Sequence, residues 1–141
     1  MVIKRILATI IDLIIAFIPA FINGMLSEHT IVLILYKTLL LYVIHTTISL
    51  LVIKMTPGER LLYVKLVSLK TDDIKKLTLV LKNLAFSLYF LIILLGLNKT
   101  SDLIMAILLF LSLNGPVFIK NKNDKPMTGL DLLFKTFYTK C

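Results

Sequence analysis

Four long apolar stretches constrain this chain more than any other feature of its sequence. They cover roughly residues 6–26, 31–53, 79–97 and 103–119 of the 141-residue chain. A helix needs about 20 mostly apolar residues to cross a hydrocarbon core of about 30 Å. The stretches lack the alternation of barrel strands, and lipid admits backbone only as helices or closed barrels. The sequence therefore predicts an all-α integral membrane protein, a single domain with four transmembrane helices.

The net charge of +8 is distributed in a way that indicates orientation in a membrane. All 16 basic residues except Lys37 and Lys99 lie before the first stretch, in or beside the segment between the second and third, or after the fourth. Cytoplasmic segments are enriched in Lys and Arg, so both termini and the central segment are expected in the cytoplasm, against the anionic headgroups of a cell membrane. Because no basic face interleaved with aromatic residues accompanies these charges, nucleic acid is not an expected partner.

Lys4 and Arg5 ahead of the first stretch also raise the alternative of a cleaved signal peptide. The stretch is about 21 residues long, against a usual 7–15, and no small-residue cleavage site follows it. We therefore expect a retained helix.

The segment after the second stretch, residues 54–78, is expected to lie at the cytoplasmic interface. Thr56, Pro57 and Gly58 form a turn signal that should end the second helix. Residues 59–70 are apolar but dotted with charge, which is typical of a segment that lies in the interface and does not cross it.

The cytoplasmic tail, residues 120–141, carries a clearer helical pattern. Thr128 can cap the start of a helix, and Asp131 and Lys135 are spaced as an i, i+4 pair. The pattern predicts a short amphipathic helix with four apolar residues on one face: Leu130, Leu133, Phe134 and Phe137.

Several of these residues together resemble a known family. Arg5 opens the first helix with Asp12 inside it, the run Thr56-Pro57-Gly58-Glu59-Arg60-Leu61-Leu62 follows the second helix, Lys82 lies near the start of the third, and Asp131 lies in the tail. This order is similar to that of the RDD family of small bacterial membrane proteins, which is named for one arginine and two aspartates. The resemblance implies that Arg5, Asp12 and Asp131 are the eponymous residues and that the other motif positions are Thr56, Pro57, Gly58, Arg60 and Lys82, the last in place of an arginine. It also implies a link to transport of unidentified ligands or to cation/proton antiport.

Each predicted helix places a polar group in the cytoplasmic third of the membrane. At about 1.5 Å per residue, Asp12 and Asn114 lie about 9 Å deep and His45 and Ser87 about 12 Å deep. Ionisable groups at this depth are costly and usually face protein or water. With Arg5, which shares the helix face of Asp12, these residues form a predicted functional polar layer.

Two interpretations of that layer stay open. Asp12 can bind an ion or a proton with His45 as its relay, or the two can form a hydrogen-bonded pair that only fixes helix packing. The break at Asn114-Gly115-Pro116 is likewise either a binding-site break or a simple kink.

The leading functional hypothesis is a small transporter of protons, cations or a small ligand that depends on Asp12. Four helices enclose little room for a pathway, so a homo-oligomer is expected. The alternative is a non-transporting accessory protein: a partner-binding subunit, an export or assembly factor, or an immunity protein against a membrane-active peptide. No nucleophile, phosphate-loop or metal motif is found and Cys141 is the only cysteine, so we expect no enzyme activity, no metal and no cofactor.

Overall fold

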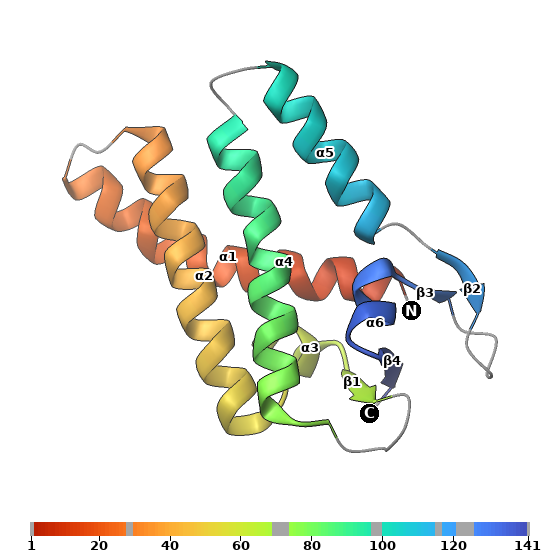
Figure 1. Cartoon of the computed structure of the whole chain (residues 1–141). Helices are drawn as coiled ribbons and strands as arrows, with labels where there is room; N and C mark the ends of the chain where they lie inside the picture. The colour runs from red at the N-terminus through yellow and green to blue at the C-terminus, as the bar shows by residue number, and fades with distance from the viewer. Residues whose placement is uncertain are drawn as a thin grey trace.

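The computed structural model describes residues 2–27, 30–68, 74–96, 100–114, 117–120 and 126–140. Three of its helices are long and apolar enough to cross a membrane (Figure 1): α1 (Val2–Leu26), α2 (Ile31–Ile53) and α4 (Lys76–Gly96). The range of α2 coincides with the second predicted stretch. Hydropathy thus identified three membrane-length helices, and the chain is a membrane-spanning protein.

The fourth predicted span is shorter than expected. α5 (Thr100–Asn114) has 15 residues, or about 22 Å of helix. Residues 117–119, which were expected to continue it, belong instead to β2 (Val117–Lys120), which pairs antiparallel with β3 (Pro126–Met127). By length alone, α5 falls short of the hydrocarbon core.

The four long helices pack in the order α1, α2, α4, α5. α2 packs against α1 and α4, and α4 packs in turn against α5. Near the end of α1, a Cβ atom on Gly24 would lie 2.4 Å from Cγ1 of Ile34 in α2, so glycine permits the close approach of the two helices. The buried residues of α2 recur every fourth position, which places them on one stripe: Ile34, Thr38, Tyr42, Thr46 and Leu50.

Two short units of the same local structure follow the helical hairpins. The first consists of α3 (Pro57–Leu61) and β1 (Val64–Ser68), and the second of α6 (Gly129–Leu133) and β4 (Thr136–Lys140). Both elements of the second unit lie 72 residues after their counterparts in the first, as do the N-caps, Thr56 and Thr128. We call them the α3–β1 unit and the α6–β4 unit.

Each short helix begins with a reciprocal capping box. The hydroxyls of Thr56 and Thr128 accept hydrogen bonds from the backbone N–H groups of Glu59 and Asp131. The two carboxylates accept from the N–H groups of the threonines in return. This arrangement satisfies N–H groups that a helix start otherwise leaves without partners.

β1 and β4 pair as an antiparallel two-stranded sheet. Leu66 lies directly opposite Tyr138, and these two residues are themselves 72 positions apart. A residue that faces its own counterpart in an antiparallel pair lies on a local two-fold axis, so the two units are related by an axis through this pair. The sheet joins the helical hairpins because Leu66 and Tyr138 pack with residues of α2 and α4, Leu50 and Leu79 among them.

The tail is therefore not the predicted amphipathic helix, and the chain is not all-α. α6 ends at Leu133, Lys135 adopts a left-handed conformation (φ 52°) like its counterpart Tyr63 (φ 53°), and Phe137 lies in β4. The apolar spacing fits a helix, but pairing with β1 supplies backbone hydrogen bonds to the tail in the extended form. The interfacial segment after the second helix is likewise folded, as the α3–β1 unit.

Candidate functional site

Asp12 holds the α3–β1 unit against the first membrane helix. Its side chain is buried, with 2% of the residue exposed. Oδ1 accepts a hydrogen bond of 2.7 Å from the backbone N–H of Gly58, and the Thr56 side chain bonds the same carboxyl group. A Cβ atom on Gly58 would lie 2.1 Å from the backbone oxygen of Ala8, so only glycine lets α3 lie this close to α1.

His45 approaches Asp12 from α2. Its Nδ1 lies 3.0 Å from the backbone oxygen of Leu41, and because a carbonyl only accepts, Nδ1 carries the hydrogen. Nε2 then carries the lone pair of the neutral ring. It is buried without a hydrogen-bond partner and lies 4.0 Å from Oδ1 of Asp12. Two acceptor atoms thus face each other, and of the two only Nε2 of His45 lacks a hydrogen-bond partner. A proton on either group would let them form a hydrogen bond if they moved closer than 4.0 Å.

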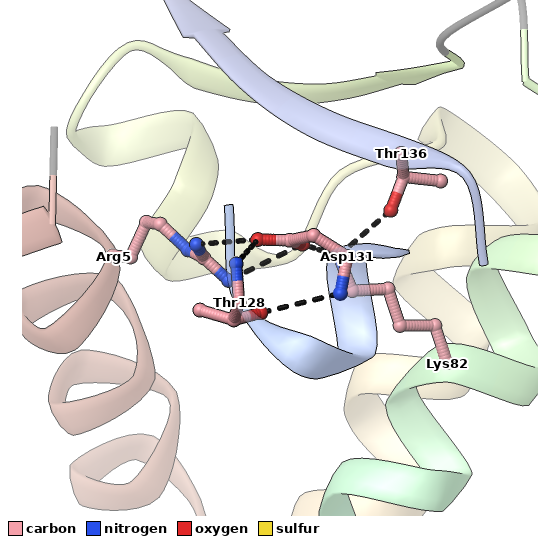
Figure 2. Close-up of polar contacts among 5 residues, drawn as sticks. All are labelled: Arg5, Lys82, Thr128, Asp131 and Thr136. Atoms are coloured by element: carbon pink, nitrogen blue, oxygen red, sulfur yellow. Dashed lines mark hydrogen bonds and ion pairs between the residues drawn. The ribbon is translucent and has the colours of Figure 1, made fainter. Parts of the chain in front are cut away.

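Asp131 is the centre of a second cluster, which joins the tail to two membrane helices (Figure 2). Arg5 Nη1 lies 2.8 Å from Oδ2 of Asp131, and Lys82 Nζ contacts Oδ1. Lys82 also donates to Thr136 Oγ1 at 3.0 Å, and the N–H of Thr128 donates to Oδ2 of Asp131. Only 1% of Asp131 is exposed, so its carboxylate is buried between two cations.

The surroundings of Asp131 favour its ionised form. Burial alone would raise its pKa, but the charges of Lys82 and Arg5 and the hydrogen bonds from Lys82 and Thr128 outweigh burial. The pKa of Asp131 therefore lies below its usual value, and the carboxylate is charged at neutral pH.

Glu59 lies between these two clusters. It is 7% exposed, and its Oε2 accepts from the N–H of Thr56 at 2.9 Å. Its side chain also hydrogen-bonds that of Tyr138. Arg5 and Lys82 lie over the ring of the same tyrosine, at 4.2 and 4.9 Å from its centroid.

Burial is the largest influence on the pKa of Glu59. It raises the pKa of the carboxyl group and outweighs the hydrogen bonds from Thr56 and Tyr138, which lower it. The Asp12 carboxylate adds to the rise and Lys82 opposes it. The result is a pKa above the usual value.

Of the predicted polar layer, the structure brings together only Asp12 and His45. Arg5 shares a helix with Asp12 but pairs with Asp131, 126 residues away. Ser87 donates to the backbone oxygen of Asn83 within its own helix. Asn114 is the last residue of α5, and its side chain, like Gly115 and Pro116, lies outside the described part of the chain.

The residues of the family motif divide between the two clusters. Thr56 and Gly58 contact Asp12, and Pro57 occupies the first turn of α3. Lys82 contacts Asp131. Arg60 is exposed.

Sequence reasoning missed Glu59, Tyr138 and Thr136 as members of the site. The spacing of Thr56 to Glu59 and of Thr128 to Asp131 is a capping-box signature that could have revealed both units. Nothing local indicates Tyr138 and Thr136, because their contacts arise from strand pairing and from Lys82. Among the described residues, no three His, Cys, Asp or Glu side chains group as a metal site.

Comparisons with protein-family models, curated proteins and solved structures find no match for this chain. Membership of the RDD family therefore stays a prediction.

Proposed function

We propose that this protein moves protons, alone or in exchange for a cation, and that Asp12 and His45 form its proton-binding pair. One observation carries the proposal. The lone pair of His45 Nε2 lies 4.0 Å from the Asp12 carboxylate, buried and without a hydrogen-bond donor among the described residues. A shared proton is the simplest ligand for two facing acceptors, and imidazole and carboxylate groups are common in proton relays at membrane depth.

We also propose that the protein lies in the plasma membrane and crosses it four times. Both termini would then lie in the cytoplasm. The support for this topology is that Arg5, Lys82 and Asp131 come from three separate parts of the chain and meet in one cluster (Figure 2). Glu59 joins them through Tyr138, over whose ring Arg5 and Lys82 lie. Two helical hairpins that leave this end of the molecule and return to it would account for the arrangement, so we propose α5 as the fourth crossing despite its length. The basic residues near this end agree with the positive-inside rule and with anionic headgroups as neighbours.

Membership of the RDD family is part of the same proposal. Its support comes from the contacts of the three eponymous residues. Arg5 and Asp131 form an ion pair, and Asp12 accepts a hydrogen bond from the backbone of Gly58 in the Thr-Pro-Gly motif. The motif residues, far apart in sequence, thus act at one end of the molecule.

We further propose that the protein acts as a homo-oligomer. Two described cavities, of about 160 and 310 Å³, are lined by other residues and not by Asp12 or His45. Because four helices enclose little room for a pathway, we expect a pathway past Asp12 to form between subunits.

The direct test is proton flux into proteoliposomes under an imposed pH gradient. Asp12→Asn should reduce flux by about tenfold or more, because removing a positioned acid–base group typically costs this much. His45→Gln should do the same. Asp102→Asn, at an exposed acid in the first turn of α5, is the matched control and should leave flux unchanged.

One observation favours the alternative, a non-transporting accessory protein. Asp12 is engaged with the Gly58 N–H, so its burial is also explained by the attachment of α3 to α1. No flux from well-folded wild-type protein, together with a stable partner that co-purifies from the membrane, would favour a partner-binding subunit, an assembly factor or an immunity protein.

A further inference from the structure

We infer that a cavity between α1 and α2 binds one anionic phospholipid, with Lys37 as the residue that contacts its phosphate. The cavity lies in the half of this hairpin that ends at the turn between the two helices. It is lined by Pro19, Ala20, Asn23, Lys37, Leu40 and Leu41. None of these residues belongs to the clusters around Asp12 and Asp131, so the inference does not depend on proton transport.

The cavity opens on the surface of the hairpin. Its volume is about 310 Å³, and Leu40 in its wall is 60% exposed. Because α1 and α2 are both long and apolar enough to span a membrane, the surface around the opening faces lipid. A lipid molecule therefore has direct access to the cavity.

Lys37 places a positive charge inside a membrane-length helix. It is the only Lys, Arg, Asp or Glu residue of α2 and lies about 9 Å along the helix from its start at Ile31. Its Nζ donates to Oδ1 of Asn23 at 2.6 Å, and Asn23 lies only about 4.5 Å from the end of α1 at Leu26. The lysine side chain therefore extends toward the end of the hairpin, where lipid headgroups lie.

Polarity changes along the cavity as it does along a phospholipid. The polar lining residues Asn23 and Lys37 meet near the end of the hairpin. Leu40 and Leu41 lie deeper, about 14 and 15 Å from the start of α2. A phosphate at the polar end leaves an acyl chain to pack against these leucines. A free anion would fill the polar end alone and leave the apolar walls without a partner, which is less favourable.

Both polar groups can donate hydrogen bonds to an anion. The ammonium group of Lys37 has only donors, and because Oδ1 of Asn23 accepts from it, the donors of the asparagine amide are on Nδ2. Hydrogen bonds between lysine and phosphate oxygens are strengthened by the opposite charges. The charge of Lys37 also favours a phospholipid with a net negative headgroup over a zwitterionic one.

Fluorescence quenching by brominated lipids tests this inference. The chain contains no tryptophan, so a single introduced tryptophan reports on the lipid at one position. Leu40→Trp places the reporter at the cavity. Leu88→Trp is the matched control, because Leu88 is 56% exposed and lies about 12 Å from the end of α4 at Gly96.

Each protein is reconstituted in vesicles of phosphatidylcholine and phosphatidylglycerol, with bromine on the acyl chains of one lipid at a time. Leu40→Trp should show a preference of about fivefold for phosphatidylglycerol, the attraction expected from one lysine. Leu88→Trp should show none. Combined with Leu40→Trp, Lys37→Gln should abolish the preference, and Lys37→Arg should retain it because arginine keeps the positive charge.

Native mass spectrometry gives a second readout, on protein without an introduced tryptophan. After purification in detergent and addition of phosphatidylglycerol, the wild type and Lys37→Arg should each retain one bound lipid. Lys37→Gln should lose it. Glutamine removes a charge from a membrane helix, so this variant is expected to insert and fold.

Three results would overturn the inference. The first is equal affinity for the two lipids at position 40 in protein that carries Lys37. The second is loss of the preference when inorganic phosphate is added at an ionic strength matched with sodium chloride, which would identify a free anion as the ligand. The third is weak quenching at position 40 by both lipids, which would show that a second copy of the chain or another protein covers the cavity.

Discussion

The α3–β1 and α6–β4 units have the same local structure and opposite electrostatics. Both begin at a threonine N-cap with a capping box, pass through a left-handed residue and end in a strand, and the two strands pair with each other. Yet Asp131 contacts two cations, while Glu59 accepts from a backbone N–H and from a tyrosine side chain. Short-range sequence sets the backbone of each unit, and the membrane helices that bring Arg5 and Lys82 set the charge of its acid.

The largest effect should come from the acid of the α6–β4 unit. Asp131→Asn leaves the buried Lys82 and the part-buried Arg5 without a carboxylate, and breaking a buried ion pair from one side costs about 3–5 kcal/mol. We expect a loss of this size in the free energy of unfolding, measured by denaturant titration in detergent micelles and followed by circular dichroism.

Glu59→Gln is the matched variant in the other unit. It keeps the capping box and breaks no ion pair among the described residues, so we expect a loss of about 1 kcal/mol or less. Equal losses for the two variants would show that the acids have the same charge state, contrary to the comparison.

A second difference lies in how each unit attaches to the membrane helices. The backbone of α3 lies against that of α1 at Gly58, whereas the corresponding position of α6 is Leu130, which is buried through its side chain. Gly58→Ala should cost about 1–3 kcal/mol, because its methyl group meets the backbone of Ala8, which has little freedom to move.

Gly24→Ala is the control for this substitution. Its Cβ meets the side chain of Ile34, which can change rotamer, so we expect a smaller loss in the same unfolding measurement. A Gly58→Ala protein as stable as Gly24→Ala would mean that α3 does not lie directly on α1.

Features of the structure that depend on local interactions could be predicted from the sequence. Lipid obliges each segment to satisfy its own backbone hydrogen bonds, so hydropathy alone gave α2 its range, Ile31–Ile53. Depth along a helix likewise placed Asp12 and His45 at similar levels, and the structure brings them together.

The same reasoning could not predict contacts between segments that are far apart in the sequence. The apolar spacing of residues 130–137 fits a helix, but the strand β4 forms because β1, 72 residues earlier, offers it a partner. Arg5 was expected on the face of Asp12, yet its partner Asp131 lies 126 residues away. Such pairings depend on how the helical hairpins pack, and the spacing of apolar residues within one segment does not contain this information.

A smaller and more specific effect should appear in the pH dependence of stability, where the two units should differ in sign. The pKa of Asp131 is lowered in the folded protein, so its contribution is present above the unfolded value of about 3.9 and is lost as the pH falls through the folded value. The pKa of Glu59 is raised, so its contribution is present below about 4.3 and is lost as the pH rises through the folded value. Measured as unfolding free energy against pH, Asp131→Asn should remove the loss on the acid side and Glu59→Gln the loss at higher pH. If both variants flatten the same limb, the opposite directions of the two pKa shifts are wrong.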